Sequence, residues 1–193
     1  VSSPVTNLMC CPMSDGAAAV IMCTKEIAMQ YTTKLIKLEA SLLTSGMFTK
    51  TQGDEVDMSV GFPKATFETY EMAGVGPKDI DLVELHDAFS HEELLCYEQL
   101  GFCEPGDCKK IVHDKYCEYG GRTPVNLSGG LLSLGHPLGA SGARVVVDVV
   151  RQLRHEADPG IQIADPKVGF CQMLGGLLYG RSGEAVYTGI IKK

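Results

Sequence analysis

The feature that most constrains the fold is an apolar run that leads almost directly into a helix-like segment. Residues 80–85, IDLVEL, have the composition of a largely buried strand, and residues 90–101, SHEELLCYEQLG, predict a helix that a glycine ends. Further strand-like runs occupy residues 33–43, 167–180 and 184–191, and helix-like spacing occupies residues 63–76 and 143–156. Strands that alternate with helices predict an α/β fold in which helices cover a mainly parallel or mixed sheet.

Three local patterns add predictions that the fold can test. The run GAAAVIMCT, residues 16–24, is short and apolar and is followed by KEIAMQY, so it predicts a buried strand that leads into a short helix. In SHEE, Ser90 stands three residues before Glu93, which predicts a capping box with Ser90 as the N-cap. Residues 181–183 predict the turn between the last two strands.

Composition and charge argue against several classes of protein. Of 193 residues, 45% are hydrophobic, which is enough for a sizeable core, and 17 basic against 24 acidic residues give a formal charge of −7. That sign is wrong for a nucleic-acid surface, so we expect no nucleic-acid partner. No apolar run approaches the roughly 18 residues needed to cross a bilayer, so we expect no membrane span. The start at Val1, without an initiator methionine, indicates a portion of a longer protein.

The turn SLGHPLGASGAR, residues 133–144, places His136 between glycines, immediately before a helix-like run. Gly135 and Gly139 permit close approach of the backbone, and Ser141 is suited to cap the helix, which places His136 near free N–H donors and suits an anion. The glycines match neither a Walker A loop nor the dinucleotide pattern G-x-G-x-x-G. On spacing alone, a catalytic histidine and a buried histidine satisfied by the backbone both stay possible.

Two other positions also have a functional and a structural interpretation. His86 and Asp87 end a strand just before a helix N-terminus, at the edge where α/β sheets gather ligands, although the carboxylate could instead only balance local charge. Cys171 lies in a strand-like segment, and the glycines after it, Gly175 among them, would let a substrate approach the backbone. Its structural interpretation is an inert buried thiol.

The eight cysteines have no regular spacing, which indicates reduced thiols rather than a disulfide framework. Cys103, Cys108, His113 and Cys117 form the series C-x4-C-x4-H-x3-C, which superficially suggests a zinc site. This series lacks the close C-x2-C pair of structural zinc loops. We therefore expect no metal site.

Together, HDAF at a strand end, GHPLGASG at a turn and a cysteine before a glycine-rich strand resemble the thiolase superfamily, within it the sterol-carrier-protein type of thiolase. The segments that carry the resemblance are NLMCCPMSDGAAA, DIDLVELHDAFS, ELLCYEQLG and NLSGGLLSLGHPLGASG, and they cover essentially the whole chain. The resemblance implies the later part of a five-layer αβαβα fold built from two similar α/β halves. Residues 1–33 would end the first half, and residues 34–193 would form the C-terminal thiolase domain.

The resemblance also implies roles for residues. In thiolases the nucleophilic cysteine lies in the first half, and the GHP histidine, here His136, takes its proton and then donates to the developing oxyanion. His86 stands where the NEAF motif of other thiolases has an asparagine that holds a water at the oxyanion hole. Sterol-carrier thiolases read HDCF, with a cysteine as second acid or base, whereas this chain has Ala88. Cys171, near the place of the C-x-G cysteine of other thiolases, is the expected substitute.

The implied activity is that of a 3-ketoacyl-CoA thiolase, an acetyl-CoA C-acyltransferase of lipid and sterol side-chain metabolism, including β-oxidation and lipid transport. Coenzyme A and acyl-CoA would be substrates, with no permanently bound cofactor, and we expect Gly135, Gly139, Ser141 and Gly175 to line their site. The alternatives are a thiolase-like C–C lyase without a nucleophilic cysteine and a non-catalytic acyl-CoA or lipid-binding relative.

The resemblance further implies a homodimer or homotetramer for the whole protein, with this chain inactive by itself. It implies a peroxisomal location, with the mitochondrion or cytoplasm as alternatives.

Overall fold

The computed structural model describes residues 3–45, 58–178 and 181–193 of the chain. Its strands are β1 (Lys37–Ser45), β2 (Leu82–Glu84), β3 (Val168–Leu178) and β4 (Arg181–Lys192). The longer helices are α2 (Met58–Ala73), α3 (Ser90–Gln99) and α6 (Leu138–Arg154). Short helices are η1 (Asn7–Met9), α1 (Lys25–Ala28), η2 (Pro77–Asp79), α4 (Cys108–His113) and α5 (Gly130–Leu134). The predicted α/β alternation is confirmed.

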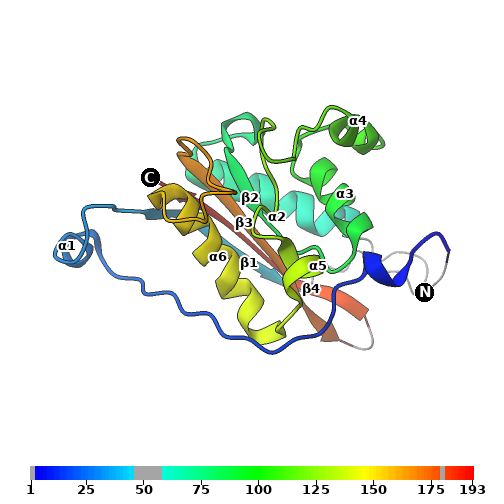
Figure 1. The fold of residues 1–193 in the computed structure, drawn as a ribbon, viewed down its shortest axis with the longest axis horizontal. Coiled ribbons are helices and arrows are strands. Elements are labelled where there is room, and N and C mark those ends of the chain that lie inside the picture. The colour runs from blue at the N-terminus through cyan, green and yellow to red at the C-terminus, as the bar shows by residue number, and fades with distance from the viewer. Residues whose placement is uncertain (1–2, 46–57, 179–180) are drawn as a thin grey trace.

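The four strands form one mixed sheet in the order β1-β4-β3-β2 (Figure 1). β4 pairs antiparallel with both β1 and β3, while β2 pairs parallel with β3. The hairpin β3–β4 lies at the centre because residues 168–192 supply two long apolar strands close together in sequence. The short β2 brings the HDAF segment to the edge of the sheet.

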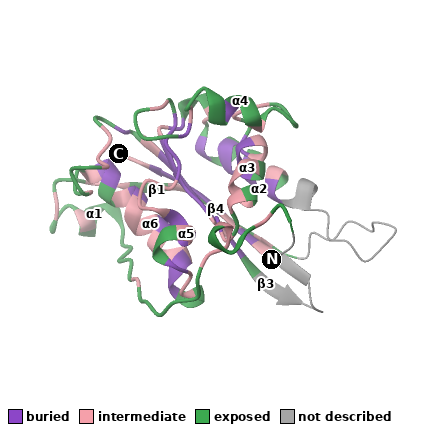
Figure 2. Ribbon diagram, turned by 45° about the vertical axis from the view of Figure 1, so that its right-hand side comes forward, coloured by how far each residue is buried: buried purple, intermediate pink, exposed green. Residues whose placement is uncertain are grey.

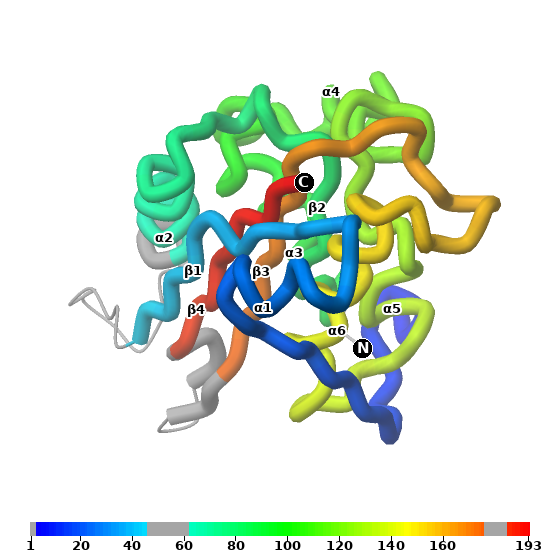
Figure 3. Tube along the Cα trace, turned by 90° about the vertical axis from the view of Figure 1, so that its left-hand side faces the viewer, coloured from blue at the N-terminus to red at the C-terminus, as the bar shows by residue number. Residues whose placement is uncertain are grey.

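Helices cover both faces of the sheet, with α2 on one side and α6 on the other (Figure 3). Successive side chains of β3 point to opposite faces, so Phe170 and Leu174 join the larger core with α2 and α3. Cys171 and Met173 face α6 in the smaller core. Buried residues accordingly gather on the sheet and on the inner sides of these helices (Figure 2).

The helix α6 packs closely on the sheet because its apolar residues recur on one side. Val145, Val149 and Leu153 follow one another at intervals of four residues, and all three are fully buried. The helix approaches β3 at Gly169, where an added Cβ would lie 2.3 Å from Cγ1 of Val149. This tight contact fixes the position of α6, and therefore of the GHPLGASG turn that begins it.

The segment before the sheet differs from its prediction. Residues 16–24 form no strand, and their apolar side chains are exposed, Ile21 at 94% and Met22 at 74% of their surface. They follow an irregular path below α6 to α1 (Figure 1). An apolar composition predicts burial, but within the described residues this run has no neighbouring strand to pair with. The boundary predicted between residues 33 and 34 stays a prediction.

Two smaller predictions are also wrong. Ser90 is the first residue of α3 and Phe89 is its N-cap, and the Ser90 hydroxyl has no hydrogen-bond partner in the described part of the chain. Residues 181–183 belong to β4 instead of forming the turn before it. Both α3 and β4 therefore begin earlier in the sequence than predicted. The ends of helices and strands are commonly misplaced by one or two residues.

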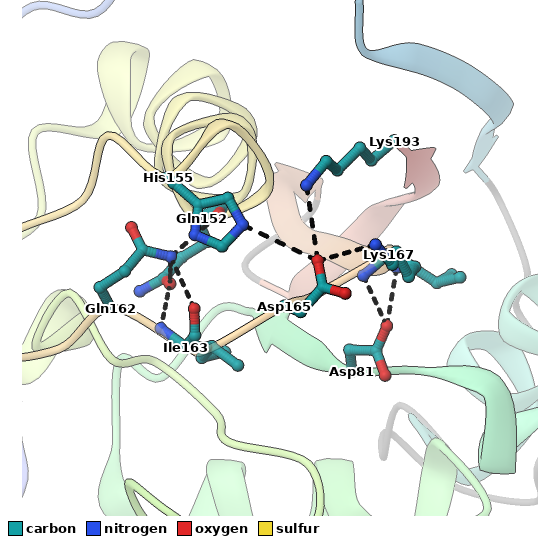
Figure 4. A network of polar contacts seen from close by, with 9 residues as sticks. Asp81, Gln152, His155, Gln162, Ile163, Asp165, Lys167 and Lys193 are labelled. Carbon is teal, nitrogen blue, oxygen red and sulfur yellow. Dashed lines mark hydrogen bonds and ion pairs between the residues drawn. The ribbon is translucent and has the colours of Figure 1, made fainter. Parts of the chain in front are cut away.

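At the end of α6 remote from the GHPLGASG turn, polar side chains hold the connection to β3 (Figure 4). The buried carboxamide of Gln152 donates to the Ile161 carbonyl, with N···O 2.9 Å, and accepts from the Ile163 amide at the same distance. The Asp81 carboxylate accepts from the Lys167 and Val168 amides at 2.7 and 2.9 Å. These contacts align β2 with the start of β3.

Candidate active site

Two histidines that lie 50 positions apart in sequence meet at one end of the sheet. His86 follows β2, and His136 precedes α6 by two residues. Their ring centroids are 5.1 Å apart, with the rings inclined at 76°. Both residues are predicted site residues, and the structure brings them together.

The tautomer of His136 follows from its hydrogen bonds. The hydroxyl of Ser141 donates to the carbonyl oxygen of Pro137 at 3.1 Å, so its oxygen is left to accept from Nδ1 of His136, 2.9 Å away. We therefore assign the proton of the neutral ring to Nδ1 and a free electron pair to Nε2. That arrangement makes Nε2 of His136 a base.

The charge state of His136 favours the same role. Burial lowers the pKa of His136 below its ordinary value of 6.5, and the nearby His86 and Arg144 lower it further, while Glu92 acts in the opposite direction. At neutral pH the ring is therefore uncharged and able to accept a proton.

His86 is fixed through both its side chain and its backbone. Its Nδ1 lies 2.7 Å from Oε1 of Glu92, in the first turn of α3, and both side chains are largely buried. Its backbone N–H donates to Oε1 of Gln172, 2.9 Å away, on β3. Nε2 of Gln172 is buried and has no hydrogen-bond partner among the described residues. A buried donor without a partner is costly, so a polar atom of a ligand or water is expected there.

Asp87 holds the short helix α5 against the HDAF segment. Its Oδ1 accepts from the backbone N–H of Leu131 at 2.6 Å, and burial raises the pKa of its carboxyl in spite of that bond. Gly130 has a φ of 60°, and a Cβ there would lie only 2.1 Å from Oδ2 of Asp87. A glycine is therefore required for this carboxylate to reach the helix.

The N-terminal segment joins the loops of the two histidines. The backbone N–H of Cys11 donates to the carbonyl of Ala88 at 2.8 Å, and the N–H of His136 donates to the carbonyl of Pro12 at 2.9 Å. Gly135, with a φ of 82°, lies so close to this segment that a Cβ would be 2.4 Å from Oγ of Ser14. Residues 11–14 therefore form part of the site.

Cys171 is not brought to the histidine pair. In the parallel register it lies opposite Glu84, two residues before His86, and its Sγ donates to the carbonyl of Val145 at 3.6 Å. Burial raises the pKa of this thiol well above its ordinary value, and the charges of Glu84 and Asp148 raise it further. Cys171 is thus a protonated thiol of the core, which fits its structural interpretation.

The residues expected to line a coenzyme A site divide into two pairs. Gly139 and Gly175 face open space, because a Cβ at either position would meet no described atom within 4 Å. Gly135 instead packs against Ser14, and Ser141 is fully buried and orients His136. Ser141 also lies inside α6, whose N-cap is Pro137, so its predicted capping role is wrong.

The described residues contain no group of three or more His, Cys, Asp or Glu side chains placed to hold a metal ion. The series Cys103, Cys108, His113 and Cys117 is included in that statement, because all four lie in the described part of the chain. Nor is any helix of the described segments long and apolar enough to cross a membrane.

Comparison with known proteins decides the family. Residues 48–187 match the family model described as thiolase C-terminal domain-like, which is well over half of the chain. The chain belongs to the thiolase superfamily. The resemblance carried by HDAF and GHPLGASG, to the C-terminal portion of a sterol-carrier-type thiolase, is confirmed.

Named relatives of the chain agree with this family. It is 38% identical over 178 residues to benzoylsuccinyl-CoA thiolase subunit BbsB of Thauera aromatica, covering 91% of the chain and 46% of the relative. Acetyl-CoA acetyltransferase of Methanothermobacter thermautotrophicus is 39% identical over 176 residues, covering 91% and 46%. Sterol carrier protein 2 of Bos taurus is 40% identical over 169 residues, covering 83% and 31%. The chain thus spans less than half of the length of these relatives.

Among solved structures, the Ltp2-ChsH2(DUF35) aldolase has the same fold, with a TM-score of 0.80 and 23% sequence identity. The match covers 100% of this chain and 48% of that chain. The predicted thiolase-like layering of helices on a mixed sheet is therefore confirmed.

Two residues of the site were missed from the sequence. The capping-box pattern points to Glu93, yet it is its neighbour Glu92 that contacts His86. Its signal was an acidic residue in the first turn of the helix that follows HDAF. Gln172 gave no signal, because it lies 86 positions from His86 and reaches it only through the pairing of β2 with β3.

Proposed function

We propose that the protein containing this domain is an acyl-CoA thiolase, which moves an acyl group between a 3-oxoacyl-CoA and coenzyme A through a cysteine outside this chain. The observation that supports this proposal most directly is the uncharged His136, with Nε2 free as a base and a second histidine ring 5.1 Å away. A base beside a second potential donor is what an acyl-transfer site needs.

His136 would act in two successive steps. Its Nε2 accepts the proton of the nucleophilic thiol, and the thiolate then attacks the carbonyl carbon at C3 of the substrate. The protonated ring next donates from Nε2 to the oxygen that becomes negative. Ser141 and Pro137 keep the ring in one orientation during both steps, because they occupy Nδ1.

His86 would supply the second donor to the oxyanion. With a proton on each ring nitrogen, His86 would donate from Nδ1 to the Glu92 carboxylate, 2.7 Å away, and from Nε2 to the substrate oxygen. The backbone contact with Gln172 holds His86 at the strand end. In this role His86 replaces the bound water that the family resemblance assigns to this place.

The substrates would be coenzyme A thioesters, as the names of two relatives, a benzoylsuccinyl-CoA thiolase subunit and an acetyl-CoA acetyltransferase, suggest. We propose that Gly139 and Gly175, which face open space, border the acyl-CoA. The likeness to sterol carrier protein 2 supports a role in lipid or sterol side-chain metabolism in the peroxisome. We further propose a homodimer or homotetramer, with residues 1–33 completing the first half of the fold.

A thiolase-like C–C lyase is the second candidate. Two observations favour it: Ala88 stands where sterol-carrier thiolases have a cysteine, and Cys171 lies in the core. The solved aldolase shows that the same fold occurs in a protein of that name. Such a lyase would break the carbon–carbon bond without an acyl-enzyme.

The complete protein, incubated with acetoacetyl-CoA and coenzyme A, tests the proposal. A thiolase produces acetyl-CoA, and mass spectrometry after acid quench shows an acyl group in thioester linkage to the protein. Cleavage without that adduct would establish the lyase. Binding of acyl-CoA by calorimetry with no product would instead establish a non-catalytic relative.

A further inference from the structure

Cys11 lies beside the histidine pair, at the position across from Ala88. Cys10 and Phe89 form an antiparallel bridge, and the next pair inward is Cys11 and Ala88, joined by the 2.8 Å hydrogen bond from N–H to carbonyl. Residues that stand directly opposite in an antiparallel pair project their side chains to the same face, with Cβ atoms about 5 Å apart. The thiol of Cys11 therefore shares a face with the methyl group of Ala88.

The surroundings of Cys11 are those of the site. Burial raises the pKa of its thiol, and the negative charges of Asp87 and Glu92 raise it further, so both carboxylates lie within electrostatic range of the sulfur. Glu92 is also the partner of His86. The thiol is thus a neutral acid that carries its proton at neutral pH.

Cys11 differs from the cysteine next to it. Sγ of Cys10 donates to the carbonyl of Thr6 at 3.6 Å, outside the histidine loops. The side chain of Cys11 is neither fully buried nor fully exposed, and it lies opposite Ala88 in the histidine loop. The unpartnered Nε2 of Gln172, whose Oε1 accepts from the His86 amide, independently indicates that a polar group belongs beside His86. Cys10 is therefore a matched control.

We propose that Cys11 is the second acid–base residue of the site, taking the function that a cysteine at position 88 would have. This inference rests on the proposed thiolase activity and assigns to a residue of this chain the proton transfer at the α-carbon of the substrate.

In the direction of cleavage, Cys11 acts first as an acid. When the bond between C2 and C3 of the 3-oxoacyl-CoA breaks, its electron pair moves to C2 of the departing acetyl-CoA, and the Cys11 S–H bond supplies the proton. The resulting thiolate regains a proton from solvent, and coenzyme A, which has released its own proton to solvent, attacks the acyl-enzyme as a thiolate. His136 returns the first proton to the nucleophilic cysteine, so each group ends as it began.

Two exchange reactions of the complete protein separate this role from the rest of the mechanism. Exchange of labelled coenzyme A into acetyl-CoA needs acyl transfer alone, whereas deuterium uptake from D2O into the methyl group of acetyl-CoA needs the second acid–base residue. Cys11→Ala is expected to lower deuterium uptake by about 100-fold or more, the usual size of a general acid–base contribution. Coenzyme A exchange and the acyl-enzyme should stay within about threefold of the wild type.

Two further variants make the assignment specific. Cys10→Ala should leave both exchanges unchanged, and adding Ala88→Cys to Cys11→Ala should restore deuterium uptake, because a thiol then returns to the same face. Unchanged deuterium uptake in Cys11→Ala overturns the proposal, and so does parallel loss of both exchanges in a folded variant. A wild-type protein that catalyses neither exchange would refute the proposed function itself.

Discussion

The two ends of α6 each carry a histidine, and the contrast between them shows what makes one a candidate for chemistry. His136 precedes the helix, with Nδ1 bonded to a buried hydroxyl and a second ring 5.1 Å away. His155 follows it as the C-cap, with Nε2 3.9 Å from the Asp165 carboxylate and 39% of its side chain exposed. The residue type is the same, and the partners differ.

The carboxylates at the two ends differ in the same way. Glu84, the last residue of β2, lies two positions before His86 and is buried, and burial raises the pKa of its carboxyl to about 7. Asp165, at the opposite end, has a pKa lowered by Lys167 and Lys193 (Figure 4). The carboxylate near the histidine pair is buried and holds its proton. The carboxylate at the far end of α6 is exposed and forms ion pairs with lysines. Buried groups whose pKa is shifted by desolvation occur more often at functional sites.

The largest expected effect comes from removing each histidine in turn. In the complete protein, His136→Ala should lower kcat for thiolysis of acetoacetyl-CoA by about 100- to 10,000-fold, because it removes both the base and an oxyanion donor. His155→Ala should leave kcat within about twofold. Steady-state rates with equal amounts of folded protein measure both, and normal activity of His136→Ala would refute the assigned role.

The next effect concerns the backbone of the site. Gly130→Ala should destabilise the fold by about 3 kcal/mol, since its Cβ would lie 2.1 Å from the Asp87 carboxylate and its φ is 60°. Gly142→Ala, inside α6, places a Cβ 3.7 Å from Met173 and should stabilise the helix by about 0.5 to 1 kcal/mol. Urea unfolding measures both, and equal values for the two variants would contradict the tight contact with Asp87.

Glu84 predicts a pH dependence of stability. Its folded pKa is about 7, above its ordinary value of 4.5, so the folded state holds this proton more tightly than the unfolded state. The free energy of unfolding should therefore fall as pH rises from about 4.5 to 7, by about 2 to 3 kcal/mol from this group.

Glu84→Gln removes that titration while keeping an oxygen for the Ser128 amide, which lies 3.2 Å from the carboxylate. The stability of the variant relative to the wild type should increase across this pH range, as urea unfolding at several pH values would measure. Asp165→Asn, at the exposed end, serves as the control. A stability difference between wild type and Glu84→Gln that does not change between pH 4.5 and 7 would show that Glu84 is ionised normally.

Much of this architecture could be predicted from the sequence because it depends on local patterns. The period of apolar residues in α6 and the apolar runs of β2, β3 and β4 identified the elements, and the HDAF and GHPLGASG motifs identified His86 and His136. The apolar run at residues 16–24 failed because composition alone does not show whether a partner is present.

The partners of the site residues were harder to predict because they depend on long-range pairing. Gln172 reaches His86 only through the parallel register of β2 and β3, and Cys11 reaches Ala88 only through the path of the N-terminal segment. Cys171 was chosen for its position near a glycine-rich strand, but alternation along β3 turns its side chain into the core under α6. Moving a residue by one position along a strand turns its side chain to the opposite face of the sheet. The spacing of a sequence motif does not show which face a residue occupies.

The smallest expected effect lies at the exposed end. Asp165→Ala removes the contact of its carboxylate with the Lys167 ammonium at 2.7 Å, together with longer contacts to Lys193 and His155. Because all these side chains are in water, the midpoint of thermal unfolding should change by less than about 2 °C, and less still in 1 M salt. Differential scanning calorimetry at low and high salt measures the change. A large, salt-independent decrease would show that this end supports the fold as firmly as the histidine end, and the contrast between the two ends of α6 would then reflect chemistry alone.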